Sequence, residues 1–427
     1  MDLLTMKNFK RIVLGNGLRV LLVPQKSSMA TTVLTLVEAG SKYEAKSLNG
    51  ISHFLEHMCF KGTTKRPKAM DIASELDGLG ASYNAFTSQE FTSYYAKVKN
   101  EYADRALEIV ADLYLNPVFD PKEIEKEKGV IIEEINMYED LPARKVDELF
   151  NELVYGDQPA GWSVAGRKEV VQKITQADFI KYRGEHYLGK ATTFVIAGGF
   201  DEKGMLEKIE AHFSGMKNGE KGQKPKVVED QSVPAEKIHF KESDQTHMIL
   251  GFRAFSVLDD RRFALSVLAD ILGGGMGSRL FQRIREEMGA AYYVGASAEL
   301  LSDHGLITMS AGVTHAKLGD VIKAGLEEFA RFRTETVKKE DLRRAKDHMN
   351  GKLYLSLETS DELGYFYGGQ EAMGRPLETP EEIAARIEAV TAEEIKTVAN
   401  DLFKNESLNL AAIGPFKDAS YGDILKV

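Results

Sequence analysis

Apolar and polar residues follow strand-like and helix-like periods in turn along the chain. From Ile12 to Val23 they alternate around Gly15-Asn16-Gly17, a pattern typical of a β-hairpin with a tight turn. The same alternation predicts strands at 31–38, 81–87, 91–98 and 192–197. Helical spacing predicts helices at 68–79, 101–115, 121–138, 145–154 and 176–187. Because strands and helices are mixed without a strict βαβ alternation, we expect an α+β fold with mainly antiparallel sheet.

The pattern starts again after a charged, aperiodic segment from Gly215 to Pro234, which is the best candidate for a linker. Strands are predicted near 237–240 and 248–252, and a helix at 262–272. Residues 174–200 match residues 390–416 without a gap, at a constant offset of 216 (390 − 174). A repeat of this length indicates a duplicated domain rather than a solenoid. We therefore expect two homologous domains, each a mainly antiparallel β-sheet packed with α-helices, at 1–215 and 236–427, joined by a linker at 216–235.

Composition narrows the class of protein. A chain of 427 residues with 43% hydrophobic residues is long enough for two to four domains. The net charge of −10, without a dense Lys/Arg stripe, disfavours nucleic acid as a partner. No apolar run approaches the roughly 18 to 20 residues of a membrane-spanning helix, so no membrane partner is expected. The single cysteine excludes an internal disulfide, and the N-terminus lacks the pattern of a signal peptide, which together favour a cytoplasmic location.

The segment HFLEH carries the candidate chemistry. His53 and His57 are four residues apart, so on a helix both imidazoles point to the same side and can reach one metal ion. Glu56 lies between them, near enough to act on a metal-bound water. Two histidines at this spacing also occur as ordinary polar residues on an amphipathic helix. A zinc site further needs a third protein ligand.

The internal repeat limits this candidate site to the first half of the chain. The helix at 121–138 matches residues 339–356 at an offset of 218 (339 − 121). In that register Glu127 falls on Ala345 and Glu134 on Lys352, and the second copy of the HFLEH helix reads SVLADILGG, without histidine. Only the first domain is therefore expected to bind metal.

Candidates for the third ligand lie on the acidic helix at 121–138. Glu127 and Glu134 are seven residues apart and share one helical face. Glu133 is the rival, but it lies about 100° around the helix from Glu134, so the two cannot face the same ion. Each of the three is equally compatible with a solvated surface carboxylate.

Together these features resemble a known family. The His53-x-x-Glu56-His57 motif, followed 77 residues later (134 − 57) by Glu134 in EKGVIIEE, is similar to the inverted motif of the zinc peptidases that include pitrilysin, insulysin and mitochondrial processing peptidase. The duplicated halves and the strand YNAFTSQEFTSYY extend the resemblance over most of the chain. With two domains in one chain, the protein resembles a bacterial-type member of the processing peptidase branch.

The resemblance implies roles for the residues of the first domain. His53, His57 and Glu134 are the implied zinc ligands, with one zinc per chain. Glu56 is the implied general base, which takes a proton from the metal-bound water, and Glu127 is the implied supporting carboxylate. The implied function is hydrolysis of peptide bonds in small or unfolded polypeptides.

The resemblance also implies how substrate is held. Asn84-Ala85-Phe86-Thr87 is similar to the edge strand to which family members bind a peptide as an added strand. Arg285 and Tyr292 are similar to the Arg/Tyr pair that the second domain supplies to the substrate carbonyl, and Tyr293 is the competitor of Tyr292.

Two functions of different class follow from these residues. One is a zinc endopeptidase, and the other is a catalytically silent scaffold or partner subunit that binds extended polypeptides. Silent members are expected to lack part of the metal set or the Arg/Tyr pair, whereas this chain keeps all of these residues. By resemblance to relatives with four such domains in one chain, we expect two copies of this chain to form a homodimer.

Overall fold

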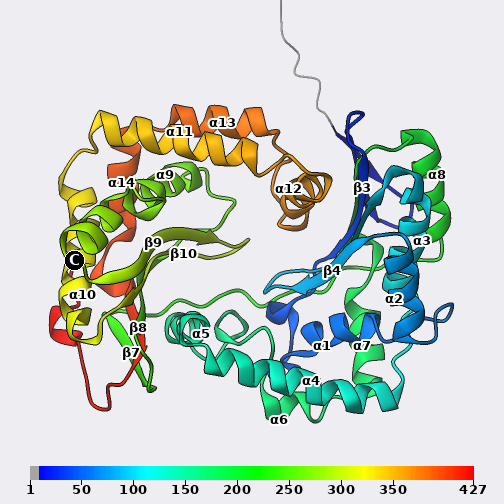
Figure 1. Ribbon diagram of the computed structural model, residues 1–427, viewed down its shortest axis with the longest axis horizontal. Helices are drawn as coiled ribbons and strands as arrows, with labels where there is room; N and C mark the ends of the chain where they lie inside the picture. The colour runs from blue at the N-terminus through cyan, green and yellow to red at the C-terminus, as the bar shows by residue number, and fades with distance from the viewer. Residues whose placement is uncertain (1–8) are drawn as a thin grey trace, which may run out of the picture. The chain divides into compact units, whose positions relative to one another are not determined.

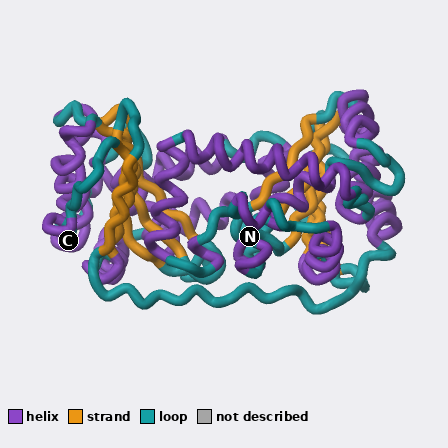
Figure 2. The backbone as a smooth tube through the Cα atoms, turned by 90° about the horizontal axis from the view of Figure 1, so that it is seen from below, coloured by secondary structure: helices purple, strands orange, loops and turns teal. Residues whose placement is uncertain are grey.

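The computed structural model describes residues 9–427, which form two compact units (Figure 1). Unit 1 comprises the described residues up to Ile135 together with Ser163–Pro225 and Tyr354–Thr379. Unit 2 comprises Asn136–Trp162, Lys226–Leu353 and Pro380–Val427. Each unit contains one sheet with helices packed beside it (Figure 2, strands orange and helices purple).

The sheet of unit 1 has six strands in the order β1-β2-β6-β3-β5-β4. Their bounds are β1 (Lys10–Val13), β2 (Arg19–Pro24), β3 (Ala30–Val37), β4 (Ser82–Thr87), β5 (Thr92–Lys99) and β6 (Thr192–Gly198). β1 and β2 form the predicted hairpin, and β2–β6 is the parallel pair among otherwise antiparallel neighbours. β4 therefore stands at an edge of the sheet.

The sheet of unit 2 repeats this order with one strand fewer. Its strands are β7 (Ala235–Phe240), β8 (Thr246–Ala254), β9 (Ala291–Leu300), β10 (Gly305–Val313) and β11 (Leu408–Gly414). They lie in the order β7-β11-β8-β10-β9, again with one parallel pair, β7–β11. The predicted α+β class with mainly antiparallel sheets is confirmed, and β9 is the edge strand that corresponds to β4.

Fourteen α-helices are assigned within residues 9–427. They are α1 (Ile51–Cys59), α2 (Ala69–Gly78), α3 (Ala103–Leu115), α4 (Pro121–Asp140), α5 (Pro142–Tyr155), α6 (Lys168–Val171), α7 (Gln176–His186), α8 (Glu202–Phe213), α9 (Arg262–Gly273), α10 (Leu318–Thr334), α11 (Lys339–Leu355), α12 (Ser360–Ala372), α13 (Pro380–Ala389) and α14 (Ala392–Leu402). α5 begins three residues before its predicted start, with Pro142 in its first turn, where the missing N–H costs no helical hydrogen bond. The residue pattern did not predict α8.

Each sheet has a hydrophobic core on both of its faces. On β3, Val33 and Val37 enter the core shared with α1 and α3, while Leu34 and Leu36 enter a second core beneath α12. The alternation follows from the two-residue period of a strand, because successive side chains point to opposite faces. The strands of unit 2 divide in the same way, with Ile249 of β8 packed toward α5 and Leu250 toward the opposite core.

Each half of the chain contributes one helix to the unit formed mainly by the other half. α5 follows α4 in sequence but packs on β8 and β11 of unit 2, and α12 from the later half packs on β3 and β6 of unit 1. The exchange is reciprocal, because α12 begins 218 residues after α5 (360 − 142), the offset found between α4 and α11. Residues 136–162 therefore lie in the first half of the chain but belong to unit 2, and residues 354–379 lie in the second half but belong to unit 1. The domain boundaries at 215 and 236, which follow the repeat, stay a prediction.

None of the helices in residues 9–427 combines the length and hydropathy that a bilayer-spanning segment needs.

Candidate metal centre

The helix that carries HFLEH is held at its start by a buried carboxylate. Glu44 accepts hydrogen bonds from the backbone N–H of Gly50 at 2.7 Å and of Ser52 at 2.8 Å, and from the side chain of Asn49 at 3.0 Å. Burial raises the pKa of Glu44, and these hydrogen bonds act against that rise. The contact anchors the first turn of α1, where four N–H groups lack partners within the helix. No pattern near the motif marks Glu44, since it lies outside the spacing of a local capping box.

Gly50, just before α1, has to be glycine. Its φ is 100°, a left-handed conformation that side chains rarely adopt, and a Cβ there would lie 2.8 Å from the carbonyl oxygen of Ala165. The backbone therefore enters α1 in a fixed direction. Phe54, Leu55 and Met58 on the helix are fully buried, which leaves the face with the two histidines turned away from the core.

Three side chains converge beside this face. His53 Nε2 and His57 Nε2 lie 3.3 Å apart, and Glu134 Oε2 of α4 lies 3.6 Å from the first and 3.5 Å from the second. Among the described residues this is the group of metal-ligating side chains whose donor atoms all fall within 4.8 Å of one another. The structure thus brings Glu134, rather than Glu133 or Glu127, together with both histidines.

The donor set fits a zinc ion. Two imidazole nitrogens and a carboxylate oxygen are common zinc ligands, and three protein ligands leave a position open for water or substrate. Nitrogen lone pairs and a carboxylate oxygen facing each other at this range repel unless a cation or proton lies between them. Burial and the neighbouring His57 lower the pKa of His53 to about 4, so this imidazole is neutral and available as a ligand at neutral pH.

Glu127 orients the second histidine. Its Oε1 lies 2.9 Å from His57 Nδ1, and its Oε2 accepts a hydrogen bond from Lys61 Nζ at 2.6 Å. A proton held on Nδ1 by this carboxylate leaves Nε2 with a lone pair on the side of His53 and Glu134, where it would be available to a metal ion. Burial acts to raise the pKa of Glu127, but the hydrogen bonds from His57 and Lys61 outweigh it and the net pKa is lowered. Glu127 is therefore ionised.

Glu56 belongs to the same helix but not to the ligand group. Thr87 at the end of β4 donates its hydroxyl hydrogen bond to Glu56 Oε2 at 2.6 Å. Burial raises the pKa of Glu56, while the bond from Thr87 and the charge on His57 act to lower it. A carboxyl group with an elevated pKa is suited to taking up a proton and giving it back near neutral pH.

The predicted substrate strand β4 flanks this site. It pairs with β5 on one side, and no other strand in the described part of the chain pairs with its second side. Ala85 and Thr87 face α1, whereas Asn84 and Phe86 point to the opposite face and are exposed. The Asn84 side chain accepts a hydrogen bond from the Ala85 N–H at 2.9 Å. An exposed edge of this kind is a template for an additional strand.

Arg285 and Tyr292 lie together in unit 2. The Arg285 guanidinium is 5.8 Å from the centre of the Tyr292 ring and 5.0 Å from that of Phe281. Tyr292 is 73% exposed, whereas the Tyr293 hydroxyl is hydrogen-bonded to His247 Nδ1 at 3.0 Å. Within the pair of candidates, Tyr292 is thus the one whose side chain faces solvent. Arg285 belongs to a π-helical segment, Phe281–Glu287, which periodicity did not predict and which is often found at functional sites.

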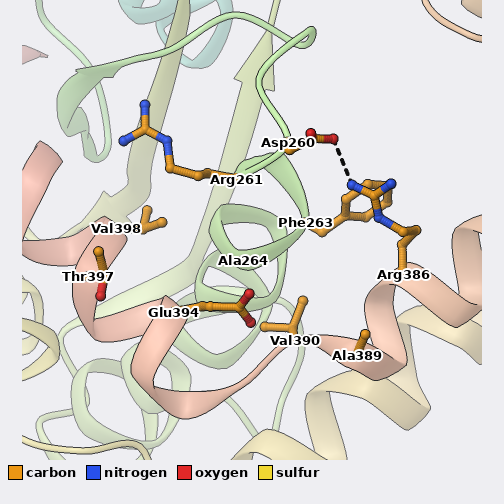
Figure 3. A pocket seen from close by; sticks show the side chains of 10 residues that line it. All are labelled: Asp260, Arg261, Phe263, Ala264, Arg386, Ala389, Val390, Glu394, Thr397 and Val398. Atoms are coloured by element: carbon orange, nitrogen blue, oxygen red, sulfur yellow. Dashed lines mark hydrogen bonds and ion pairs between the residues drawn. The ribbon is translucent and has the colours of Figure 1, made fainter.

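Unit 2 also holds a pocket of about 280 Å³ between α9, α13 and α14 (Figure 3). Its floor is apolar, formed by Phe263, Ala264 and Val398 among others. On its rim, Arg386 donates a hydrogen bond to Asp260 at 2.7 Å, seen as the dashed line in Figure 3. None of the predicted metal-binding, catalytic or substrate-binding residues lines this pocket.

Comparison with known proteins identifies the family of this chain. The family model described as insulinase (peptidase family M16) matches residues 19–168, and that described as the peptidase M16 inactive domain matches residues 173–349. The His–His–Glu group lies within the residues that the first of these models matches. The chain belongs to peptidase family M16.

Two relatives described as zinc proteases match this chain over nearly their whole length. A Rickettsia felis protein described as an uncharacterized zinc protease is 38% identical over 416 residues, which cover 96% of this chain and 98% of that protein. The uncharacterized zinc protease YmxG of Bacillus subtilis is 34% identical over 407 residues, or 95% of this chain and 98% of that protein.

Solved structures share the fold. A protease from Helicobacter pylori has a TM-score of 0.88 at 22% identity, over 95% of this chain and 99% of that one. A peptidase M16 inactive domain structure from Pseudomonas fluorescens also has a TM-score of 0.88, at 19% identity, over 97% of this chain and 100% of that one.

Proposed function

We propose that this chain is a zinc endopeptidase that hydrolyses peptide bonds in small or unfolded polypeptides, with one zinc per chain held by His53, His57 and Glu134. The observation that carries the proposal is the convergence of these three donor atoms within 4.8 Å of one another, on and beside the helix that carries the half-buried Glu56. A zinc ion held there would supply a Lewis acid and would lower the pKa of water bound to it.

Glu56 is the proposed general base. Its Oε2 accepts a hydrogen bond from the Thr87 hydroxyl at 2.6 Å, which holds the carboxylate toward the end of β4. The elevated pKa lets it accept a proton from the attacking water and donate it to the leaving amine nitrogen. Glu127 does not touch the substrate in this proposal, and it holds His57 in the ligating orientation.

β4 is the proposed substrate strand. An extended peptide pairing with Asn84–Thr87 would hydrogen-bond through its backbone, which tolerates many sequences and requires that the peptide be unfolded. Thr87 ends β4 and also bonds Glu56, so a peptide paired along β4 would run past the proposed base. The Asn84 side chain would have to release the Ala85 amide for such pairing.

Arg285 and Tyr292 are proposed to contact the substrate backbone and the developing oxyanion. Their mutual contact and the exposure of the Tyr292 side chain support a joint role. A homodimer and a cytoplasmic location stay predictions from the sequence, and the mass of the native particle tests the first.

The test measures zinc content and proteolysis together. Wild type and Glu56→Gln are purified, their zinc per chain is measured by mass spectrometry, and both are incubated with a flexible basic peptide. We expect about one zinc in each protein, and a loss of kcat on the order of 100-fold to 10,000-fold in the variant. A wild type that binds zinc but cleaves no unfolded peptide would refute the peptidase and favour the polypeptide-binding scaffold.

A further inference from the structure

Helix α12 brings residues of the later half of the chain onto the sheet of the proposed catalytic unit. Gly364 and Gly368 face the sheet, and a Cβ at Gly368 would lie 2.7 Å from Leu36 Cδ1. Both glycines are buried, and the absence of side chains lets the helix backbone approach the strands closely. The register of α12 on the sheet is therefore narrowly defined.

Ionic contacts join both ends of this helix to strands of the sheet in unit 1. Asp361 accepts a hydrogen bond from Lys97 of β5 at 2.6 Å. At the other end, Glu371 forms a bidentate pair with Arg11, with both distances at 2.8 Å. These contacts hold the intervening side chains of α12 in place, including that of Tyr365.

Tyr365 packs against the outer face of the predicted substrate strand. Its ring centre is 5.5 Å from that of Phe86 on β4 and 5.7 Å from that of Tyr95 on β5, and its hydroxyl is 3.4 Å from Ser93 Oγ. Phe86 also contacts Phe91, at 5.8 Å between ring centres. Phe86 nevertheless remains 37% exposed, so part of this aromatic surface stays available.

An added strand would present alternate side chains to this surface. Along β4, Thr87 points to the face of Glu56, while the adjacent Phe86 points to the face of α12. A peptide paired beside β4 has the same two-residue period, so every second side chain would lie on the side of Phe86 and Tyr365. Aromatic and aliphatic side chains pack favourably against such a surface, and charged ones do not.

The second unit indicates that the fold itself does not require an aromatic ring here. At the offset of 218, the buried positions of α5 coincide with those of α12, as Val146 with Gly364 and Leu149 with Tyr367. In that register Asp147 occupies the place of Tyr365 (365 − 147 = 218). The aromatic contact is thus particular to the unit that carries the metal ligands.

We propose that Tyr365, together with Phe86, forms a subsite that selects apolar, and above all aromatic, side chains at alternate positions of an extended polypeptide bound along β4. This inference rests on the proposed peptidase function, because it specifies the substrate class of the same site. Tyr365 is a specificity-determining residue and takes no part in the chemical step.

The test uses peptides that differ at one position, which carries Phe, Leu, Ser or Glu, in an otherwise fixed flexible sequence scanned over neighbouring positions. Their kcat/KM values are measured for wild type, Tyr365→Phe, Tyr365→Leu and Tyr365→Ser. At the responsive positions, we expect Tyr365→Ser and Tyr365→Leu to lower the ratio of the Phe to the Ser peptide by about threefold to tenfold, mainly through KM, the range that one aromatic pair contributes. Tyr365→Phe retains the ring and should retain the ratio.

The matched control is Tyr102→Ser, since Tyr102 is an exposed tyrosine of unit 1 outside this aromatic cluster. Thermal unfolding of each variant is recorded, and Tyr365→Leu, which preserves apolar volume, carries the test if Tyr365→Ser does not fold. The same ratio in wild type, Tyr365→Leu and the control would overturn the subsite.

A binding measurement separates failure of the subsite from failure of the peptidase. Glu56→Gln is combined with Tyr365→Leu, and the dissociation constants of fluorescent Phe and Ser peptides are compared with those of Glu56→Gln alone. A preference for the Phe peptide that disappears with Tyr365 supports the subsite even if the wild type cleaves nothing, in which case only the peptidase is refuted. Equal affinities for both peptides overturn the subsite even if cleavage is observed.

Discussion

The contact between Glu127 and His57 makes a quantitative prediction about metal affinity. Glu127 is 4% exposed, and its ionised carboxylate joins His57 Nδ1 at 2.9 Å and Lys61 Nζ at 2.6 Å. Glu127→Gln keeps an acceptor for the imidazole but removes the charge. A hydrogen bond to a charged group is worth about 1 to 1.5 kcal/mol more than a neutral one. We therefore expect zinc to bind about fivefold to tenfold more weakly, since 1.4 kcal/mol is a factor of ten.

Glu127→Ala removes the acceptor as well as the charge. The His57 imidazole is then free to rotate, and loss of such an orienting partner costs about 10-fold to 100-fold in metal affinity. We expect the alanine variant to lie within this range, and so to bind zinc more weakly than the glutamine variant, whose expected loss is about fivefold to tenfold. The order of the two variants follows from the two separate contributions of the carboxylate.

Zinc affinity is measured by competition with a chromophoric chelator of known affinity, at fixed pH and ionic strength. The matched control is Glu125→Gln on the same helix, because the Glu125 side chain is 70% exposed and pairs with Lys128 away from the site. This variant should bind zinc as the wild type does. Equal zinc affinity in wild type, Glu127→Gln and Glu127→Ala would refute the orienting role of Glu127.

Three further predictions concern the base, the entry to the helix and acid stability. Thr87→Val removes the hydroxyl that bonds Glu56 at 2.6 Å, and should lower kcat about tenfold with zinc content unchanged; a variant with full kcat would show that the bond does not position the base. Gly50→Ala places a Cβ on a residue in a left-handed conformation and 2.8 Å from a backbone oxygen, so the free energy of unfolding should fall by about 1 to 3 kcal/mol or more. Urea unfolding measures this loss, and the control is Gly78→Ala, a helical glycine with open space around it. Equal losses in the two variants would contradict this reason. Burial acts to raise the pKa of Glu108, but hydrogen bonds from Arg66 and Lys65 hold it at about 2. The resulting stability is present above the ordinary glutamate pKa and is lost as pH falls toward 2, so Glu108→Gln should show a smaller decrease in the urea midpoint between pH 5.5 and pH 3 than wild type, and an unchanged decrease would contradict it.

The local order of strands and helices could be predicted from the sequence because it depends on short periods. The hairpin around Gly15-Asn16-Gly17 lies where the alternation places it, and HFLEH lies on a helix, as the shared side of its two histidines requires. The internal match at offset 216 predicted a second sheet, and the strand order of unit 2 agrees with it. The π-helical segment around Arg285 escaped prediction, because its seven residues are too few for a change of period to be recognised in an amphipathic pattern.

The candidate site was predictable in part. The spacing of His53 and His57 indicated a shared ligand face, and Glu127 and Glu134 shared a face seven residues apart. Spacing alone could not decide which carboxylate approaches both imidazoles and which one contacts only Nδ1 of His57. That choice depends on how α4 lies against α1, which is set by packing between segments about 70 residues apart in sequence.

The sequence by itself therefore determined the elements, the duplication and the ligand types, since these depend on neighbouring residues and on self-similarity. Tertiary structure alone decided what meets across long separations. It brought Glu134 close to both histidines and Glu127 into contact with Nδ1 of His57. It also brought Glu44 to the N–H groups of the first turn of α1, and Tyr365 beside Phe86. The reason is physical, because such contacts arise from the burial of whole faces, and no periodicity records which face of a distant helix will be covered.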